Sequence, residues 1–166
     1  YEYLVNKKEF NDIKKEEVNF VLNIFKKVKN LDIINEKYLN HGDISISNII
    51  KTKKEFYIID FDEVTITTPL YDYAVIVIKN FVKNNKLDLK KYRLFKTRIK
   101  NYYHYNNEDY ENIVKYYLCK ILIEKFYLHS TKQIDLFSKR QMNDNYNKYL
   151  NILKQIENIG CDKNVS

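Results

Sequence analysis

Glycine and proline are almost absent from this chain, and their scarcity limits the folds that it can adopt. Among 166 residues there are two glycines, Gly42 and Gly160, and one proline, Pro69. Tight turns and the corners of β-sandwiches and barrels use these two residue types heavily, whereas the interior of a helix excludes them. The chain is long enough, and at 45% hydrophobic residues apolar enough, to bury the core of one domain. We therefore expect long helices rather than a turn-rich β fold.

The net charge of +7 does not by itself indicate a nucleic-acid-binding protein. Only three of the 29 basic residues are arginines, and the lysines are spread among acidic residues along every segment. No nucleic-acid-reading motif accompanies the charge, so we do not expect nucleic acid as a partner. A basic RNA- or DNA-binding module remains the third functional alternative, and salt-insensitive binding would exclude it.

Neither a membrane segment nor a metal-binding cysteine pattern is visible. No run approaches the ~18 apolar residues that a spanning helix needs. We find no signal peptide, and we expect no membrane partner. Cys119 and Cys161 have neither metal-ligand nor C-x-x-C spacing, which fits reduced thiols in the cytoplasm.

Hydrophobic periodicity predicts the order of the elements. Apolar residues at helical spacing predict an amphipathic helix over about 15–30: Val18, Val21, Leu22, Phe25 and Val28. Two short β-branched runs predict a hairpin with strands 48–52 and 55–61. The stretch VTITTPL, interrupted by Pro69, is predicted to be a loop, and the apolar run Val75–Ile78 is compatible with either a buried strand or a buried helix.

Helical patterns follow to the end of the chain. One helix is expected from about 88, a second from a cap at 106–109 to about 129, and a last one around 146–156, with Gly160 as its C-cap. The fold class is therefore α+β, mostly helical. We expect residues 1–158 to form the folded lobe and residues 159–166 to be a disordered tail.

The chemistry concentrates in HGDISISNII, residues 41–50, and in the YIIDFD that follows. In the predicted hairpin the strand starting at Asn48 and the strand ending at Asp60 are antiparallel, so these two residues share one rim, with Asp43 just upstream. Amide and carboxylate oxygens are ligands that Mg²⁺ accepts together with phosphate. A nearby carboxylate can accept the proton of an attacking hydroxyl.

The pattern H-x-D-x-x-x-x-N, followed after a hairpin by D-F, resembles the catalytic core of protein-kinase-like phosphotransferases. HGD with IDFD is similar to the aminoglycoside phosphotransferase and choline kinase branch, and within it to bacterial spore-coat kinase-like proteins of CotS type. YDYA at 71–74 resembles the stretch that opens the next helix in that branch, which implies a helix over 71–84. Gly42 stands where protein kinases have arginine, so phospho-switching of their type is not expected.

The resemblance assigns roles to particular residues. Asp43 would be the catalytic base, Asn48 and Asp60 the Mg²⁺ ligands, and Ile59 would pack under the adenine of ATP. His41 would brace the loop. Asp72 would bond the backbone of residues 41–43, or would act as a helix N-cap, or both.

The implied protein is the C-terminal lobe of a kinase-like fold with a catalytic-loop hairpin. Its function would be Mg²⁺- and ATP-dependent phosphate transfer to a small-molecule hydroxyl. The N-terminal lobe is not in this sequence, which starts with Tyr1, so we expect it in cis and expect the fragment alone to be inactive. The alternative is a non-catalytic scaffold or spore-coat protein, with spore-coat proteins as partners and the coat as its location.

Several other residues allow simple explanations. Asp62 is expected to face solvent, and His104 and His129 are expected to be packing or surface residues. The tyrosines of 102–105 and 116–117 fit a core or surface role, or the aromatic wall of a substrate cleft. The acidic residues at 108–111 fit a solvated helix start or a site for a cationic acceptor.

Overall fold

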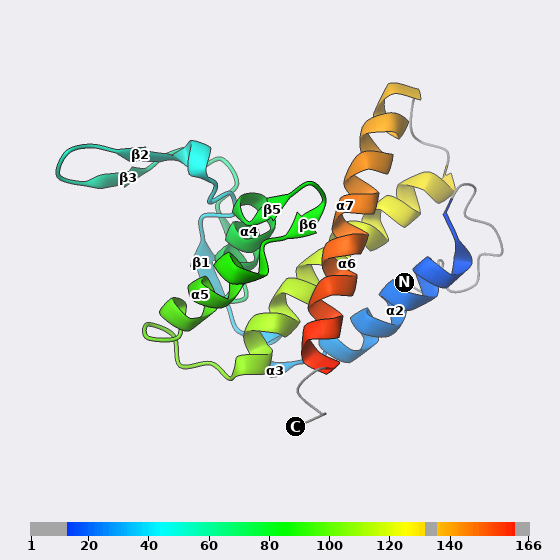
Figure 1. Ribbon diagram of the computed structural model, residues 1–166, viewed down its shortest axis with the longest axis horizontal. Coiled ribbons are helices and arrows are strands. Elements are labelled where there is room, and N and C mark those ends of the chain that lie inside the picture. The colour runs from blue at the N-terminus through cyan, green and yellow to red at the C-terminus, as the bar shows by residue number, and fades with distance from the viewer. Residues whose placement is uncertain (1–12, 132–135, 162–166) are drawn as a thin grey trace. The chain divides into compact units, whose positions relative to one another are not determined.

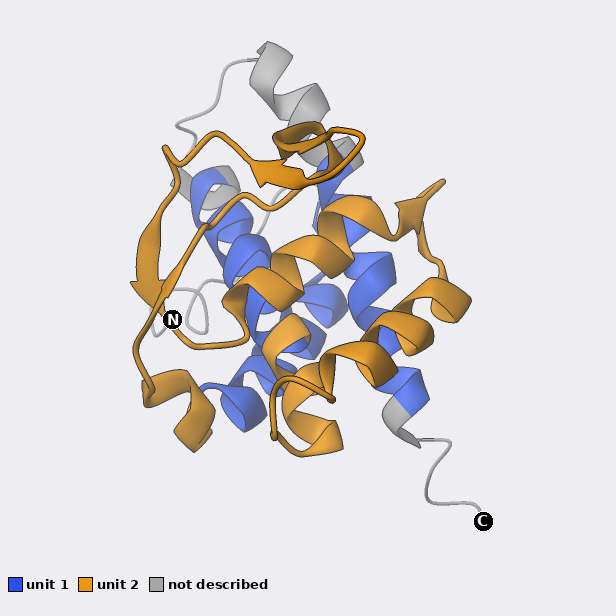
Figure 2. Cartoon of the chain, turned by 90° about the vertical axis from the view of Figure 1, so that its left-hand side faces the viewer, with its two compact units in different colours: residues 1–29, 115–166 blue, residues 30–114 orange. Residues whose placement is uncertain are grey.

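The structure, a computed structural model, describes residues 13–131 and 136–161. Its described part is α+β and mostly helical, which confirms the predicted class. Two compact units make up the chain, residues 1–29 with 115–166 and residues 30–114, and Figure 2 colours them separately. No helix in the described ranges is long and apolar enough to cross a membrane.

The first unit packs helices around an apolar core. It contains α2 (Lys15–Val28), α7 (Leu136–Cys161) and the part of α6 (Asn107–Thr131) from residue 115 onward. The periodic face of α2 is buried as predicted, with Val18, Val21 and Leu22 at most 4% exposed. The Tyr146 hydroxyl donates to Glu17 at 2.6 Å, so a polar bond at the edge of this core joins α7 to α2.

The second unit contains all the residues of the predicted site. It begins with α3 (Asp32–Asn35), β1 (Tyr38–Asn40) and a 3₁₀ turn, η1 (Ile46–Asn48). The strands β2 (Ile49–Lys51), β3 (Phe56–Ile58) and β4 (Thr65–Thr67) follow, and then α4 (Tyr71–Asn80), β5 (Val82–Lys83), β6 (Lys86–Leu87), α5 (Leu89–Ile99) and the start of α6.

The β2–β3 hairpin forms where the sequence predicts it. Ile49 pairs with Ile58 and Lys51 with Phe56, in antiparallel register. Figure 1 shows this ribbon extending away from α4 and α5, the helices of its own unit. Every residue of both strands is exposed. The hairpin is therefore a two-stranded sheet that no other described element covers.

Two sequence predictions for this unit are wrong. VTITTPL is not only a loop, because β4 pairs with β1, Tyr38 opposite Thr67 and Asn40 opposite Thr65. The helix expected over 71–84 ends at Asn80, because a second hairpin, β5–β6, follows. The two residues between β5 and β6, Asn84 and Asn85, both have positive φ, at 52° and 59°. This is the conformation of a type I′ turn, and asparagine tolerates it well.

The predicted bounds of α5 and α6 are close to the observed ones. The backbone N–H of Asn106 donates to the Asp109 carboxylate at 2.9 Å, so the predicted cap at the start of α6 is present. The last helix is longer than its pattern predicts. Gly160 lies inside α7, and residues 159–161 of the predicted tail are helical, because α7 continues to Cys161. Residues 162–166 of that tail lie outside the described residues.

Candidate functional site

Asp72, in the first turn of α4, holds the backbone of the HGD loop. Its two carboxylate oxygens accept hydrogen bonds from the backbone N–H groups of His41, at 2.8 Å, and Gly42, at 2.9 Å. This confirms the predicted bracing role. The alternative role as N-cap is wrong, because Leu70 is the N-cap residue of α4. Hydrogen bonds to a charged acceptor are among the stronger ones, so the start of the loop is fixed to α4.

Gly42 is required at its position by its backbone conformation and by its neighbours. Its backbone φ is +86°, and residues that have a Cβ rarely adopt this conformation. A Cβ built at this position would lie 2.0 Å from the backbone oxygen of Glu63. The loop therefore passes so close to the backbone after the hairpin that only glycine fits.

His41 connects the loop to the hairpin. The Asp43 backbone N–H donates to Nδ1 of His41 at 3.3 Å, which makes Nδ1 the acceptor and Nε2 the protonated nitrogen. Nε2 lies 3.0 Å from the Ile59 carbonyl oxygen, to which it donates. The buried imidazole also packs against Phe61, with 4.7 Å between ring centroids. The predicted bracing role of His41 is therefore confirmed.

Asn48 lies between the loop and the end of β3. Its Nδ2 donates to the Asp43 backbone oxygen at 2.9 Å, and its own backbone oxygen accepts from the Ile59 N–H at 3.0 Å. Asn48 is 8% exposed. Since Nδ2 is occupied by a carbonyl, the amide orientation is fixed, and Oδ1 accepts a long bond of 3.4 Å from Ser47. The predicted rim therefore exists at the backbone level, with Asn48 beside Ile59.

Asp60 follows Ile59 directly, in an unusual conformation. Its φ is 66°, so the chain turns sharply as it leaves β3. Asp60 and Asp62 are both exposed, which confirms the prediction for Asp62. Among the described residues, the Asp60 carboxylate has no hydrogen bond or ion pair. The structure thus places Asp60 at the end of the correct strand but provides no contact that orients its side chain.

Asp43 is held by a residue that the sequence predictions missed. Its carboxylate forms an ion pair with the ammonium group of Lys79 in the last turn of α4. The side chains remain 24% and 43% exposed, respectively, so the pair is open to solvent. Lys79 is seven residues after Asp72, a spacing that places both on one face of a helix. That spacing is the signal that could have found it.

Asn80 holds the far end of the same loop. Its Oδ1 accepts from the Ile46 backbone N–H at 2.9 Å, and its Nδ2 donates to the Ile44 carbonyl oxygen at 3.3 Å. With Asp72 on residues 41 and 42, α4 therefore contacts the loop at both its beginning and its end. The sequence predictions did not include Asn80, because its role depends on a contact between residues more than 30 positions apart.

The predicted Mg²⁺ ligands have suitable chemistry but form a small donor set. One amide oxygen and one carboxylate are hard oxygen donors of the type that Mg²⁺ binds along with phosphate and water. Within the described ranges, no group of three or more His, Cys, Asp or Glu side chains could hold a metal ion. The assignment of Asn48 and Asp60 as Mg²⁺ ligands therefore stays a prediction.

Comparison of the chain with protein-family models, with curated proteins and with solved structures finds no match.

Proposed function

We propose that this chain is the C-terminal lobe of a kinase-like phosphotransferase that transfers the terminal phosphate of ATP to a small-molecule hydroxyl. One observation carries the proposal. Asp72 and His41 fix the HGD loop, and Asn48 bonds both the Asp43 backbone and the end of β3. This network brings the loop and the residue before Asp60 together, as a phosphotransfer site of this type requires.

Asp43 is the group that would accept the proton of the acceptor hydroxyl. Its carboxylate is partly exposed. Its backbone N–H donates a hydrogen bond to His41, and its backbone oxygen accepts one from Asn48. A base must be held at hydrogen-bond reach of its substrate, and these backbone bonds provide such positioning. Lys79 adds a positive charge beside the place where a phosphate would be transferred.

Asn48 and Asp60 would hold Mg²⁺, which when bound with ATP supplies positive charge at the phosphate oxygens. Ile59, 40% exposed between them, would contact the adenine ring. The exposed hairpin is compatible with an N-terminal lobe that covers it in the intact protein. A C-terminal lobe alone would form half of such a nucleotide cleft and should bind ATP weakly, so the test needs a method that detects weak binding.

Paramagnetic broadening in NMR spectra provides that method. We expect Mn²⁺ with ATP to broaden the signals of residues 43, 48 and 60 selectively, because Mn²⁺ occupies oxygen sites as Mg²⁺ does. Asp60→Asn should weaken the affinity for Mn²⁺ with ATP about tenfold, and the broadening should decrease accordingly, because one charged ligand contact is lost. Asp62→Asn is the matched control, since Asp62 is also exposed and has no proposed role. Equal broadening in both variants, or none in the wild type, contradicts the proposal.

Catalysis is tested in the intact protein with its N-terminal lobe. There, Asp43→Ala should lower phosphate transfer about 100-fold or more, the usual effect of losing a general base. Unchanged transfer would rule out the assigned role.

One observation favours a second function, a scaffold or spore-coat role. Several large apolar side chains of the hairpin are exposed, Phe56 at 68% and Ile50 at 47%. Surface of this kind marks sites of protein association. Self-association or recruitment that survives the double change Asp43→Ala and Asp60→Ala would support this role, and loss of assembly in that variant would count against it.

A further inference from the structure

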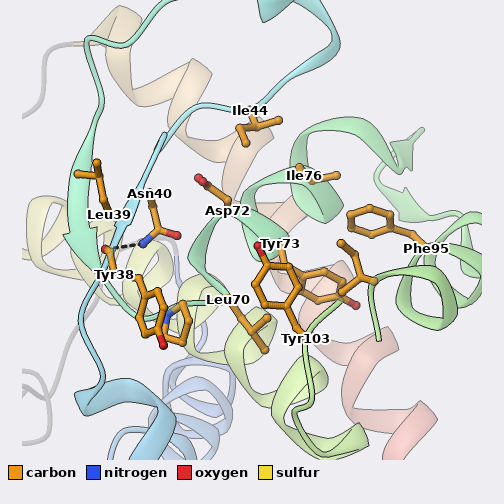
Figure 3. A pocket seen from close by; sticks show the side chains of 12 residues that line it. Tyr38, Leu39, Asn40, Ile44, Leu70, Asp72, Tyr73, Ile76, Phe95 and Tyr103 are labelled. Carbon is orange, nitrogen blue, oxygen red and sulfur yellow. Dashed lines mark hydrogen bonds between the residues drawn. The ribbon is translucent and has the colours of Figure 1, made fainter. Parts of the chain in front are cut away.

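A cavity in the second unit has the composition of a small-molecule site. Its volume is about 210 Å³, and β1, α4, α5 and the segment after α5 line it (Figure 3). Ile44 of the HGD loop and Asp72 also line it, so the cavity adjoins the proposed phosphate site, but none of the three proposed phosphotransfer residues (43, 48 and 60) is in its lining. A cavity of ~150 Å³ is sufficient to bind benzene, so this larger cavity has room for an aromatic molecule with one ring or two fused rings.

Aromatic rings make up much of the wall. Tyr73 and Phe95 stack with 5.3 Å between centroids and an interplanar angle of 6°, and they form one side. Tyr38 and Tyr103, 53% and 44% exposed, line the cavity where it reaches solvent. Burial raises the pKa of the Tyr73 phenol, so this wall stays uncharged. A planar apolar ring can stack on such surfaces.

Asn40 places one unpaired acceptor inside this wall. It is 5% exposed, and its Nδ2 lies 3.0–3.4 Å from three backbone oxygens, those of Tyr38, Thr67 and Thr68. The opposite amide orientation would direct Oδ1 at three carbonyls, so the assignment is secure. Figure 3 shows Oδ1 directed into the cavity. Among the described residues, nothing donates a hydrogen bond to it.

A ligand that fills the cavity would cover Oδ1 of Asn40, and an acceptor buried without a donor is costly, so such a ligand must supply an N–H or O–H. Asp72 also lines the cavity, and its carboxylate favours a donor over a second acceptor or an anion. We propose that this cavity binds a small aromatic molecule of one or two fused rings that donates an N–H hydrogen bond to Oδ1 of Asn40. The inference is independent of the proposed phosphotransfer.

Indole and 1-methylindole test the proposal as a pair, because they differ only in the N–H group. The chain contains no tryptophan, so indole fluorescence can be followed without a tryptophan background. We expect saturable binding of indole and about tenfold weaker binding of 1-methylindole. The pair tests the hydrogen bond without changing Asn40, whose side chain also holds three carbonyls.

Two matched variants of α5 test the location. Ile99→Phe places a larger side chain in the lining and should abolish indole binding, whereas Leu94→Phe makes a similar change at an exposed position outside it and should not. If Ile99→Phe does not fold, intermolecular NOEs from indole to Phe95 and Tyr103 in the wild type decide the question. Absence of saturable binding, equal affinity for both probes, or absence of those NOEs would overturn the proposal.

Discussion

The loop 41–48 and the hairpin β2–β3 are consecutive in the sequence but are supported in opposite ways. In the loop, His41 and Asn48 are each 8% exposed, and side chains from α4 bond the backbone at both ends. In the hairpin, every residue of both strands is exposed. The candidate site therefore has one half fixed to α4, whereas the other half is held by strand pairing and by the contacts of Ile59 and Phe61 with His41. An isolated two-stranded hairpin is marginally stable in water, so Asp60 should be ordered less firmly than Asp43.

Gly42→Ala should produce the largest loss of stability, because it affects the most tightly fixed part of the loop. Positive φ strain and the clash with Glu63 should together lower the free energy of unfolding by roughly 4 kcal/mol. Urea denaturation measures this difference. Ile46→Ala, at a 76% exposed position of the same loop, is the control and should change little. Similar denaturation midpoints for the two variants would show that the loop is not fixed as described.

Asp72→Ala should have the next largest effect. It removes the acceptor of two backbone N–H groups at His41 and Gly42, and a loss of roughly 3 kcal/mol in unfolding free energy is expected. Urea denaturation is again the measurement. Asp62→Ala, which removes an exposed carboxylate, should leave the midpoint within about 0.5 kcal/mol of wild type. Equal effects of the two changes would contradict the bracing role.

Asn80→Ala should have a smaller effect, because the bonds that it removes lie nearer the surface. Loss of its bonds to Ile46 and Ile44 should cost roughly 1 kcal/mol. Hydrogen exchange should also accelerate at the Ile46 amide while the His41 amide keeps its protection. Protection of the Ile46 amide that does not change would mean that Asn80 does not hold this end of the loop.

Phe56→Ser in the hairpin should have the smallest effect on stability. Phe56 is 68% exposed, so unfolding free energy should change by less than about 0.5 kcal/mol. Thermal or urea unfolding of this chain checks the prediction. A loss above 1.5 kcal/mol would show that the hairpin is packed in solution, and the contrast with the loop would then disappear.

The sequence predicted the locally encoded parts of this arrangement. The 3.6-residue spacing of Val18, Val21 and Leu22 predicted α2, and β-branched runs predicted the hairpin. The bracing role of Asp72 came from the resemblance rather than from local pattern. The helix at 71–80 also required the resemblance, since its β-branched residues favour a strand when taken alone.

The missed features depend on contacts across long sequence separations. β4 pairs with β1 across a long separation, Thr67 opposite Tyr38, 29 residues earlier. Each strand has only three residues, which is too short for a two-residue periodicity to predict it. Lys79 and Asn80 contact residues more than 30 positions away. The end of α4 was locally encoded, however, since Asn84 and Asn85 form a recognised hairpin turn that the prediction overlooked.

Because one helix bonds the loop from Asp72 at its first turn to Asn80 at its end, unwinding of α4 would release residues 41, 42 and 46 in a single event. The amides at these positions should therefore exchange with solvent as one cooperative unit, at the rate at which α4 opens, whereas the hairpin should open on its own and far more often. The position of Asp43 would then persist for as long as this helix remains folded.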